Sequence, residues 1–248
     1  MKKTNIEILR ERKEIWRSKE VIRRLYIKWY HIISNALKPG NILELGGGSG
    51  NLQEFFSHAI TSDILFAPWL DAVLDAEHLP FKAESLDNIV LFDVLHHLTN
   101  PINFFIEARR ILRSGGKIIL MEPYISWASF FVYRFLHAED VTWHIEPFKT
   151  NRTQKNDQPF HGNQAIPTLL FEKYSERFTK EFPEFKIIKT EKMDFIIYPL
   201  SGGFHNPSLI PLPLYSSLEK VEILLRPFNH ILAFRFIIVL EKQPKEKE

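Results

Sequence analysis

The sequence predicts an α/β protein with a doubly wound, mostly parallel sheet of seven strands. Between residues 41 and 123, short β-rich runs alternate with helical runs, which is typical of βαβ units. The run "NILEL" leads directly into a glycine-rich turn. After Tyr124 the pattern changes to aromatic-rich segments, which we interpret as lid insertions that cover one end of the sheet.

The individual elements follow from hydrophobic periodicity and from helix breakers. Apolar residues at helical spacing predict one helix over residues 5–37, which the tripeptide "KPG" ends. We expect strands at 41–45, 59–64, 71–76, 88–95, 117–123, 185–200 and 230–243, and helices at 51–57, 101–113 and 166–182. A polar loop is expected at 149–158.

Composition and charge narrow the class of protein. The apolar fraction of 45% and the charged fraction of 25% are those of a globular protein. No cysteine is present, which excludes disulfides and thiolate metal sites. The first residues, "MKKTNIEILRERKEIW", lack the apolar core of a signal peptide, and no apolar run is long enough to span a membrane. We therefore expect a cytoplasmic protein.

Residues 1–38 are expected to form a helical cap, followed by a larger domain over 39–248 with insertions at about 124–165 and 199–231. Net positive charge is concentrated at the start of the chain, because residues 1–40 hold eleven Lys and Arg against four Glu, about +7, which leaves about −5 for the remainder. Such a helix can contact anionic lipid or phosphate, or can simply expose a solvated face. A peripheral membrane contact therefore stays open.

The stretch "NILELGGGSGN" contains the first candidate for a binding site. Four of the ten glycines of the chain lie within five residues here, directly behind a predicted strand. Glycines at such a turn let the backbone bend sharply or approach a ligand closely. A dinucleotide fingerprint would need a third glycine at Asn51, whereas the observed order is Glu44, Gly46, Gly48 and Gly50.

This glutamate–glycine pattern resembles that of class I S-adenosylmethionine-dependent methyltransferases. The segments "DAEHLPFKAESLDNIVLFDVLHHLTNP" and "ARRILRSGGKIILMEP" resemble the UbiE-like small-molecule branch, with a methyltransferase type 11 domain. The resemblance covers about residues 38–123. It implies a Rossmann-like fold, a methyltransferase domain at 39–248, and S-adenosylmethionine as the cofactor, which leaves as S-adenosylhomocysteine.

The resemblance also implies roles for single residues. The glycine loop would meet the methionine part of the cofactor, Glu44 its amino end, and Asp63 the ribose hydroxyls. Asp75 and Ala76 would lie at the adenine, and Leu91 and Phe92 would place backbone carbonyls near the sulfonium. The complete set of implied cofactor-binding residues is Glu44, Gly46, Gly47, Gly48, Gly50, Asp63, Ile64, Asp75, Ala76, Leu91 and Phe92.

One segment departs from the family pattern. Only eleven residues separate Asp63 from Asp75, and Pro68 interrupts them, so at most a turn fits where the family usually has a helix. The adenine pocket is then more open, or Trp69 and Phe66 fill the missing wall.

The acceptor is less constrained by the sequence. A general base is needed only if the acceptor must lose a proton. We consider His97, His96 and His144 as the first catalytic candidates, and His161 and His205 as further ones. The histidines are scattered without metal-ligand spacing, so no metal site is expected. The signature of enzymes that methylate exocyclic amines of bases is missing, so no nucleic-acid partner is expected.

The aromatic insertions favour a hydrophobic or amphipathic acceptor, or a homodimer contact. We therefore predict methyl transfer to a small-molecule, lipid or sugar acceptor, at oxygen. Two alternatives are a nicotinamide-dependent oxidoreductase and a catalytically inactive methyltransferase-like binding protein.

Overall fold

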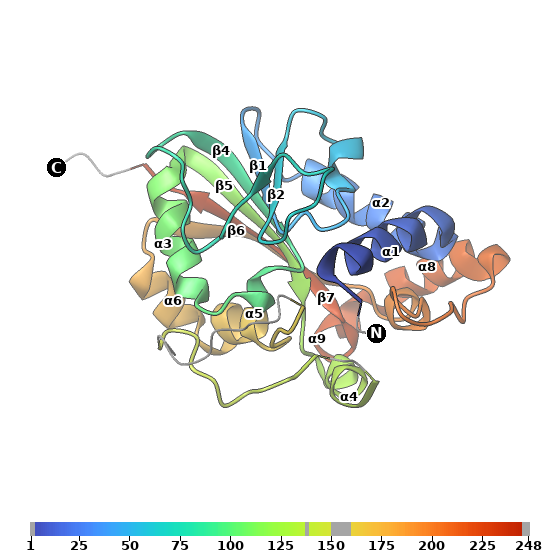
Figure 1. Cartoon of the computed structure of the whole chain (residues 1–248). Coiled ribbons are helices and arrows are strands. Elements are labelled where there is room, and N and C mark those ends of the chain that lie inside the picture. Colours follow the sequence, from blue (N-terminus) through green and yellow to red (C-terminus); the bar gives the residue numbers. More distant parts are fainter. Residues whose placement is uncertain (1–2, 137–138, 150–159, 245–248) are drawn as a thin grey trace.

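A computed structural model describes residues 3–136, 139–149 and 160–244. Its centre is a seven-stranded sheet in the order β3-β2-β1-β4-β5-β7-β6 (Figure 1). The strands are β1 (Ile42–Leu45), β2 (Ile60–Asp63), β3 (Ala72–Val73), β4 (Leu86–Phe92), β5 (Leu112–Pro123), β6 (Phe185–Met193) and β7 (Arg235–Lys242). The first five pair in parallel, and β7 runs antiparallel between β5 and β6. The predicted fold class is confirmed.

Helices cover both faces of this sheet. One face packs against α3 (Pro101–Ile111) and α6 (Ser175–Glu181), through Phe104, Phe105, Phe178 and Phe182. The other face packs against α2 (Glu20–Ser34), whose Leu25, Trp29 and Ile33 are buried. Because side chains alternate along a strand, Leu91 belongs to the first core and its neighbour Phe92 to the second.

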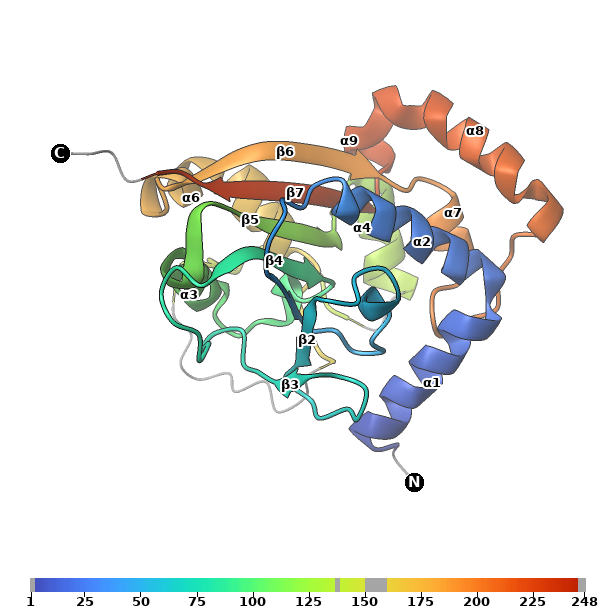
Figure 2. The same cartoon turned by 90° about the horizontal axis from the view of Figure 1, so that it is seen from above.

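The first segment forms two helices rather than the single predicted one. Helix α1 (Asn5–Ser18) and α2 are separated by Lys19, whose backbone is extended. The Lys19 ammonium donates hydrogen bonds to the carbonyls of Gly203 and Asn206, both at 2.6 Å. The break therefore arises from a contact with a distant part of the chain. Figure 2 shows α1, α2 and α8 (Tyr215–Leu225) together at one side of the molecule.

The predicted helix at 51–57 is also wrong, because the structure has only the short 3-10 turn η1 (Leu52–Glu54) there. The glycine loop takes up the residues directly after β1, and β2 begins at Ile60, so too little chain is left for a full helix. Between Asp63 and Asp75 the structure has turns and the short strand β3 but no helix, as the sequence predicts.

The later helices and strands are more divided than predicted. The expected helix at 166–182 consists of α5 (Ile166–Thr168), the π-helical η3 (Leu169–Lys173) and α6. The expected strand at 185–200 ends at Met193, and α7 (Ile197–Leu200) follows. Part of the expected last strand is α9 (Asn229–Leu232). Most of the polar loop expected at 149–158 lies outside the described residues.

The aromatic-rich insertions contain α4 (Trp127–Leu136), η4 (Leu212–Leu214), α8 and η5 (Arg226–Phe228). Helix α4 packs against α9, so the two insertions meet. No helix in the described parts of the chain is both long enough and apolar enough to cross a membrane. The division into a cap at 1–38 and a domain at 39–248 stays a prediction, although α2 shares its core with the sheet.

Candidate functional site

The glycine loop lies at the carboxyl end of β1, where open α/β sheets bind ligands. Gly46, Gly48 and Gly50 all have positive φ, between +47° and +74°. A β-carbon at Gly46 would lie 2.2 Å from Val94 Cγ2, so the fold itself requires glycine there. At Gly48 a β-carbon would meet nothing nearer than 3.8 Å, so this position is open to a ligand.

Glu44 lies beneath this loop with its side chain almost fully buried. Its Oε2 has no hydrogen-bond partner among the described residues. A β-carbon at Gly47 would lie 2.7 Å from that oxygen. Burial, and secondly the charge of Asp63, raises the pKa of Glu44 to about 8. A buried carboxylate oxygen without a partner fits a ligand that brings a positive charge, such as an amino group.

Asp63 closes β2 and lies on the other side of the loop. Its Oδ2 accepts a hydrogen bond from the Gly48 amide at 2.9 Å, and its Oδ1 accepts one from Leu65 N at 2.9 Å. Burial raises the pKa of Asp63, against these backbone hydrogen bonds and the charge of Arg12. Since a carboxylate has about four acceptor positions, Asp63 keeps capacity for ligand hydroxyls.

Trp69 covers the loop, as one of the two predicted replacements for the missing helix. Its indole nitrogen donates to the Gly48 carbonyl at 2.9 Å, and its ring blocks the β-carbon position of Gly50. Lys13 of α1 lies over the indole ring, 4.6 Å from its centroid. Phe66, the other candidate, is 71% exposed. Trp69 and α1 therefore cover the loop at Gly48 and Gly50.

The predicted adenine contacts, Asp75 and Ala76, follow β3, and the predicted cofactor-binding residue Ile64 follows β2. Ile64 is exposed and Ala76 is buried. The carboxylate of Asp75 accepts a hydrogen bond from Glu77 N at 2.8 Å, and its other oxygen lies 3.1 Å from His78 Nδ1. The Asp75 carboxylate thus stabilises the turn that it begins, and its contact with adenine stays a prediction.

At the end of β4, Leu91 and Phe92 turn their side chains into the two cores, so only their backbone can face a ligand. Asp93 follows with φ +56°, in the left-handed region that disfavours most side chains. Its carboxylate forms a bidentate pair with the buried Arg235, at 2.6 and 3.1 Å. No local pattern in the sequence indicates this pair, which joins the end of β4 to β7.

The histidines follow in η2 (Leu95–His97). His96 is buried, with Nδ1 2.7 Å from Glu122 Oε2 and Nε2 3.2 Å from Glu139 Oε2. Burial opposes a charge on His96, but the hydrogen bonds and charges of Glu122 and Glu139 outweigh it and raise its pKa to about 10. Burial and the neighbouring charge of His96 lower the pKa of His97 to about 4.

The structure brings His96 and His97 together, and the backbone at His161 and Gly162 packs against this pair. His144 is exposed in a turn within residues 139–149, and His161 is exposed as well. His205 is in a loop beside α1, and burial lowers its pKa. Glu139 was not identified from the sequence, because no local pattern links it to a histidine pair 42 residues earlier.

Comparisons with known proteins agree with this geometry. Residues 43–120 match the family model described as a methyltransferase domain. The ubiquinone/menaquinone biosynthesis C-methyltransferase UbiE of Bordetella parapertussis is 27% identical over 156 residues, which cover 44% of this chain and 59% of that protein. The tRNA U34 carboxymethyltransferase of Nautilia profundicola is 38% identical over 71 residues, covering 28% and 22%.

Among solved structures, a SAM dependent methyltransferase from Archaeoglobus fulgidus superposes with a TM-score of 0.53 at 15% identity, covering 89% of this chain and 94% of that one. This likeness shows a shared fold. The chain spans about half the length of the curated relatives it matches.

Residues 43–120 therefore resemble a methyltransferase domain, and the sheet order and the glycine loop with its two carboxylates agree with that resemblance.

Proposed function

We propose that the chain transfers a methyl group from S-adenosylmethionine to an oxygen atom of a small-molecule, lipid or sugar acceptor. The observation that carries the proposal is the unpartnered, buried Oε2 of Glu44 beneath an open Gly48. When bound, the cofactor supplies a methyl group on a positively charged sulfur, which is a good leaving group.

The protein's own contribution is then alignment and exclusion of water. Glu44 would pair with the amino group of the methionine part, and the Gly48 backbone would pass close to it. Asp63, on the neighbouring strand, would accept the ribose hydroxyls. Trp69 and α1 would keep water from the loop, because both already lie over it.

His97 is the best placed of the three predicted bases for taking a proton from an acceptor hydroxyl. Both ring nitrogens of His96 face carboxylates, so His96 has no free nitrogen for this task. The Nδ1 of His97 has no hydrogen-bond partner among the described residues. His144 would need to approach from the exposed turn in which it lies.

Binding and turnover experiments test the proposal and its alternatives. Calorimetry with S-adenosylmethionine, S-adenosylhomocysteine and NAD should show binding of the first two only; binding of NAD alone would favour the oxidoreductase. Incubation with methyl-labelled cofactor and fractionated cell extract should then yield a labelled product. Cofactor binding without any labelled product would favour the inactive binding protein.

A lipid surface is the setting that we propose for the acceptor. Trp127, Phe131 and Phe135 of α4 are 73%, 56% and 72% exposed at a spacing of four residues, so they form one apolar stripe. Phe228 and Ile231 are also exposed, and α9, which contains Ile231, packs against α4. The basic helices α1 and α2 lie at the same side as α8 (Figure 2). Exposed apolar residues and basic helices are each features of proteins that bind an anionic membrane surface.

Flotation with vesicles that contain anionic phospholipid tests this contact. The wild type should float with these vesicles, and the double variant Trp127→Glu, Phe131→Glu should remain in the bottom fraction while keeping its melting temperature. A wild type that stays unbound would refute the membrane contact. A wild type that elutes as a dimer, which the same two substitutions split, would assign the stripe to a homodimer contact instead.

A further inference from the structure

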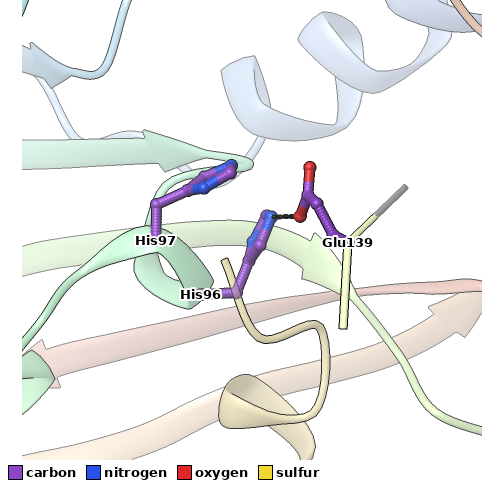
Figure 3. A group of neighbouring side chains, drawn as sticks. All are labelled: His96, His97 and Glu139. Atoms are coloured by element: carbon purple, nitrogen blue, oxygen red, sulfur yellow. Dashed lines mark ion pairs between the residues drawn. The ribbon is translucent and has the colours of Figure 1, made fainter. Parts of the chain in front are cut away.

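Two imidazoles and a carboxylate meet beside the carboxyl end of β4. Figure 3 shows His96 and His97 rising from η2 toward Glu139, which comes from the segment after α4. The candidate ligand atoms of the three residues all lie within 4.8 Å of one another. Two histidines and one carboxylate are a ligand set that catalytic zinc sites use, with the fourth position left for water or substrate.

The distance between two of these atoms suits a shared ion. His96 Nε2 lies 3.2 Å from Glu139 Oε2. Two ligands that each lie about 2.0–2.1 Å from a tetrahedral zinc ion are roughly 3.3 Å apart. A simple hydrogen bond would give a similar distance, so the surrounding contacts decide between the two arrangements.

The contacts behind His96 and Glu139 are those of a supported metal site. Glu122 Oε2 lies 2.7 Å from His96 Nδ1, while its Oε1 accepts hydrogen bonds from Val94 N and Leu95 N. A fixed carboxylate on one ring nitrogen turns the other nitrogen toward a metal, which is the usual support of a ligating histidine. On the opposite side, Gln164 Nε2 donates to Glu139 Oε2 at 2.5 Å and so orients that carboxylate.

The His97 ring is packed between the His96 ring and the backbone of Gly162. Its Nδ1 is buried without a hydrogen-bond partner among the described residues, and its ring lies 4.1 Å from that of His96. A β-carbon at Gly162 would lie 2.8 Å from this nitrogen and 2.9 Å from His96 Cδ2. Gly162 has no positive φ that would demand glycine. Glycine is therefore needed at 162 because its backbone packs directly against both rings, and any side chain there would displace them.

We propose that His96, His97 and Glu139 bind one divalent ion of the zinc class, with a fourth coordination position open toward the acceptor. The sequence predicts no metal site, because two of the ligands are adjacent and the third is remote. The ion and the base role of His97 exclude each other, since the same nitrogen cannot hold both a metal and a proton.

The role of the ion rests on the proposed function, whereas its binding does not. An acceptor hydroxyl at the open position would lose its proton to solvent more readily, because a bound cation stabilises the oxygen anion. The O–H bond breaks, the oxygen keeps the electron pair, and water carries the proton away. The ion would thereby prepare an oxygen nucleophile without a protein base.

Metal titration without cofactor or acceptor tests the site. Untagged protein, treated with a chelator and dialysed, is titrated with Co²⁺ while the visible absorption of tetrahedral cobalt is followed, and with Zn²⁺ in a calorimeter. One ion should bind per chain. His97→Ala and Glu139→Gln should each lose this binding, and Glu122→Gln should weaken it by about 10- to 100-fold.

The control is His144→Ala, which removes an exposed histidine near Glu139 in the chain and should bind like the wild type. Circular dichroism melting shows whether each variant is folded. A wild type that takes up no stoichiometric ion, or a folded His97→Ala that binds as well as the wild type, would overturn the proposal. Because the titration needs no S-adenosylmethionine, its failure would leave the proposed function standing, and failure of cofactor binding would leave the metal result standing.

Discussion

Replacing Glu44 by glutamine should remove a pH-dependent loss of stability. The Glu44 side chain is only 3% exposed, and its pKa rises from an ordinary value of 4.5 to about 8. Folding therefore favours the protonated carboxyl, so the stabilisation is complete below about pH 4.5 and is lost as the pH rises through about 8. At about 1.4 kcal/mol per pKa unit, the loss is on the order of 5 kcal/mol.

The assay is urea unfolding of the wild type and Glu44→Gln from pH 5 to pH 9. Glutamine resembles the protonated carboxyl, so the two free energies of unfolding should be similar at pH 5. They should diverge by several kcal/mol by pH 9, with the variant more stable. All other titrating groups are common to both proteins and cancel in the difference. Curves that run parallel over the whole range would refute the reasoning.

Three further substitutions test the candidate cofactor site and the ion pair that joins β4 to β7. Asp63→Asn should weaken binding of S-adenosylhomocysteine by about 10- to 150-fold in calorimetry, because charged hydrogen bonds contribute about 1.5–3 kcal/mol; an unchanged dissociation constant would remove Asp63 from the ribose. For the ion pair of Asp93 with the buried Arg235, Asp93→Asn should cost about 5 kcal/mol of unfolding free energy and Arg235→Met about 3. The order follows from exposure, since the Asp93→Asn variant keeps a guanidinium that is 1% exposed, whereas Arg235→Met keeps a carboxylate that is 32% exposed. The reverse order in chemical denaturation would contradict this account.

The parts of the fold that the sequence predicts are those with a local signal. The strands β1, β2, β4 and β5 all overlap the apolar runs that predict them, although β4 covers Leu86–Phe92 rather than 88–95 and β5 begins at Leu112 rather than at 117. Helix α3 begins at Pro101, directly after the turn that the sequence indicates. Such elements need no knowledge of what packs against them.

The errors arise where distant contacts decide the local structure. No residue near Lys19 predicts a break between two helices, because the carbonyls that accept hydrogen bonds from its ammonium belong to Gly203 and Asn206. Strand β6 ends near Asp194, whose carboxylate accepts a hydrogen bond from the indole of Trp29 in α2 at 2.7 Å. Periodicity contains no information about partners so far away in the chain.

The candidate site divides in the same way. The glycine loop and Asp63 could be named from the sequence, since the motif is contiguous and the carboxylate closes the next strand. That Gly48 is open while Gly46 is filled by Val94 depends on packing, and so does the unpartnered oxygen of Glu44. The meeting of His96 with Glu139 depends on the path of the chain after α4, which no spacing rule predicts.

Binding of S-adenosylmethionine to Gly48→Ala, set against Gly115→Ala, tests the central claim most directly. Both glycines have positive φ, and an added β-carbon meets nothing nearer than 3.8 Å at Gly48 and 3.7 Å at Gly115. Both variants should therefore lose a similar amount of unfolding free energy, about 1–2 kcal/mol, from backbone strain. Calorimetry should show wild-type affinity in Gly115→Ala and no measurable binding in Gly48→Ala. Equal affinity in the two variants would show that the cofactor binds elsewhere.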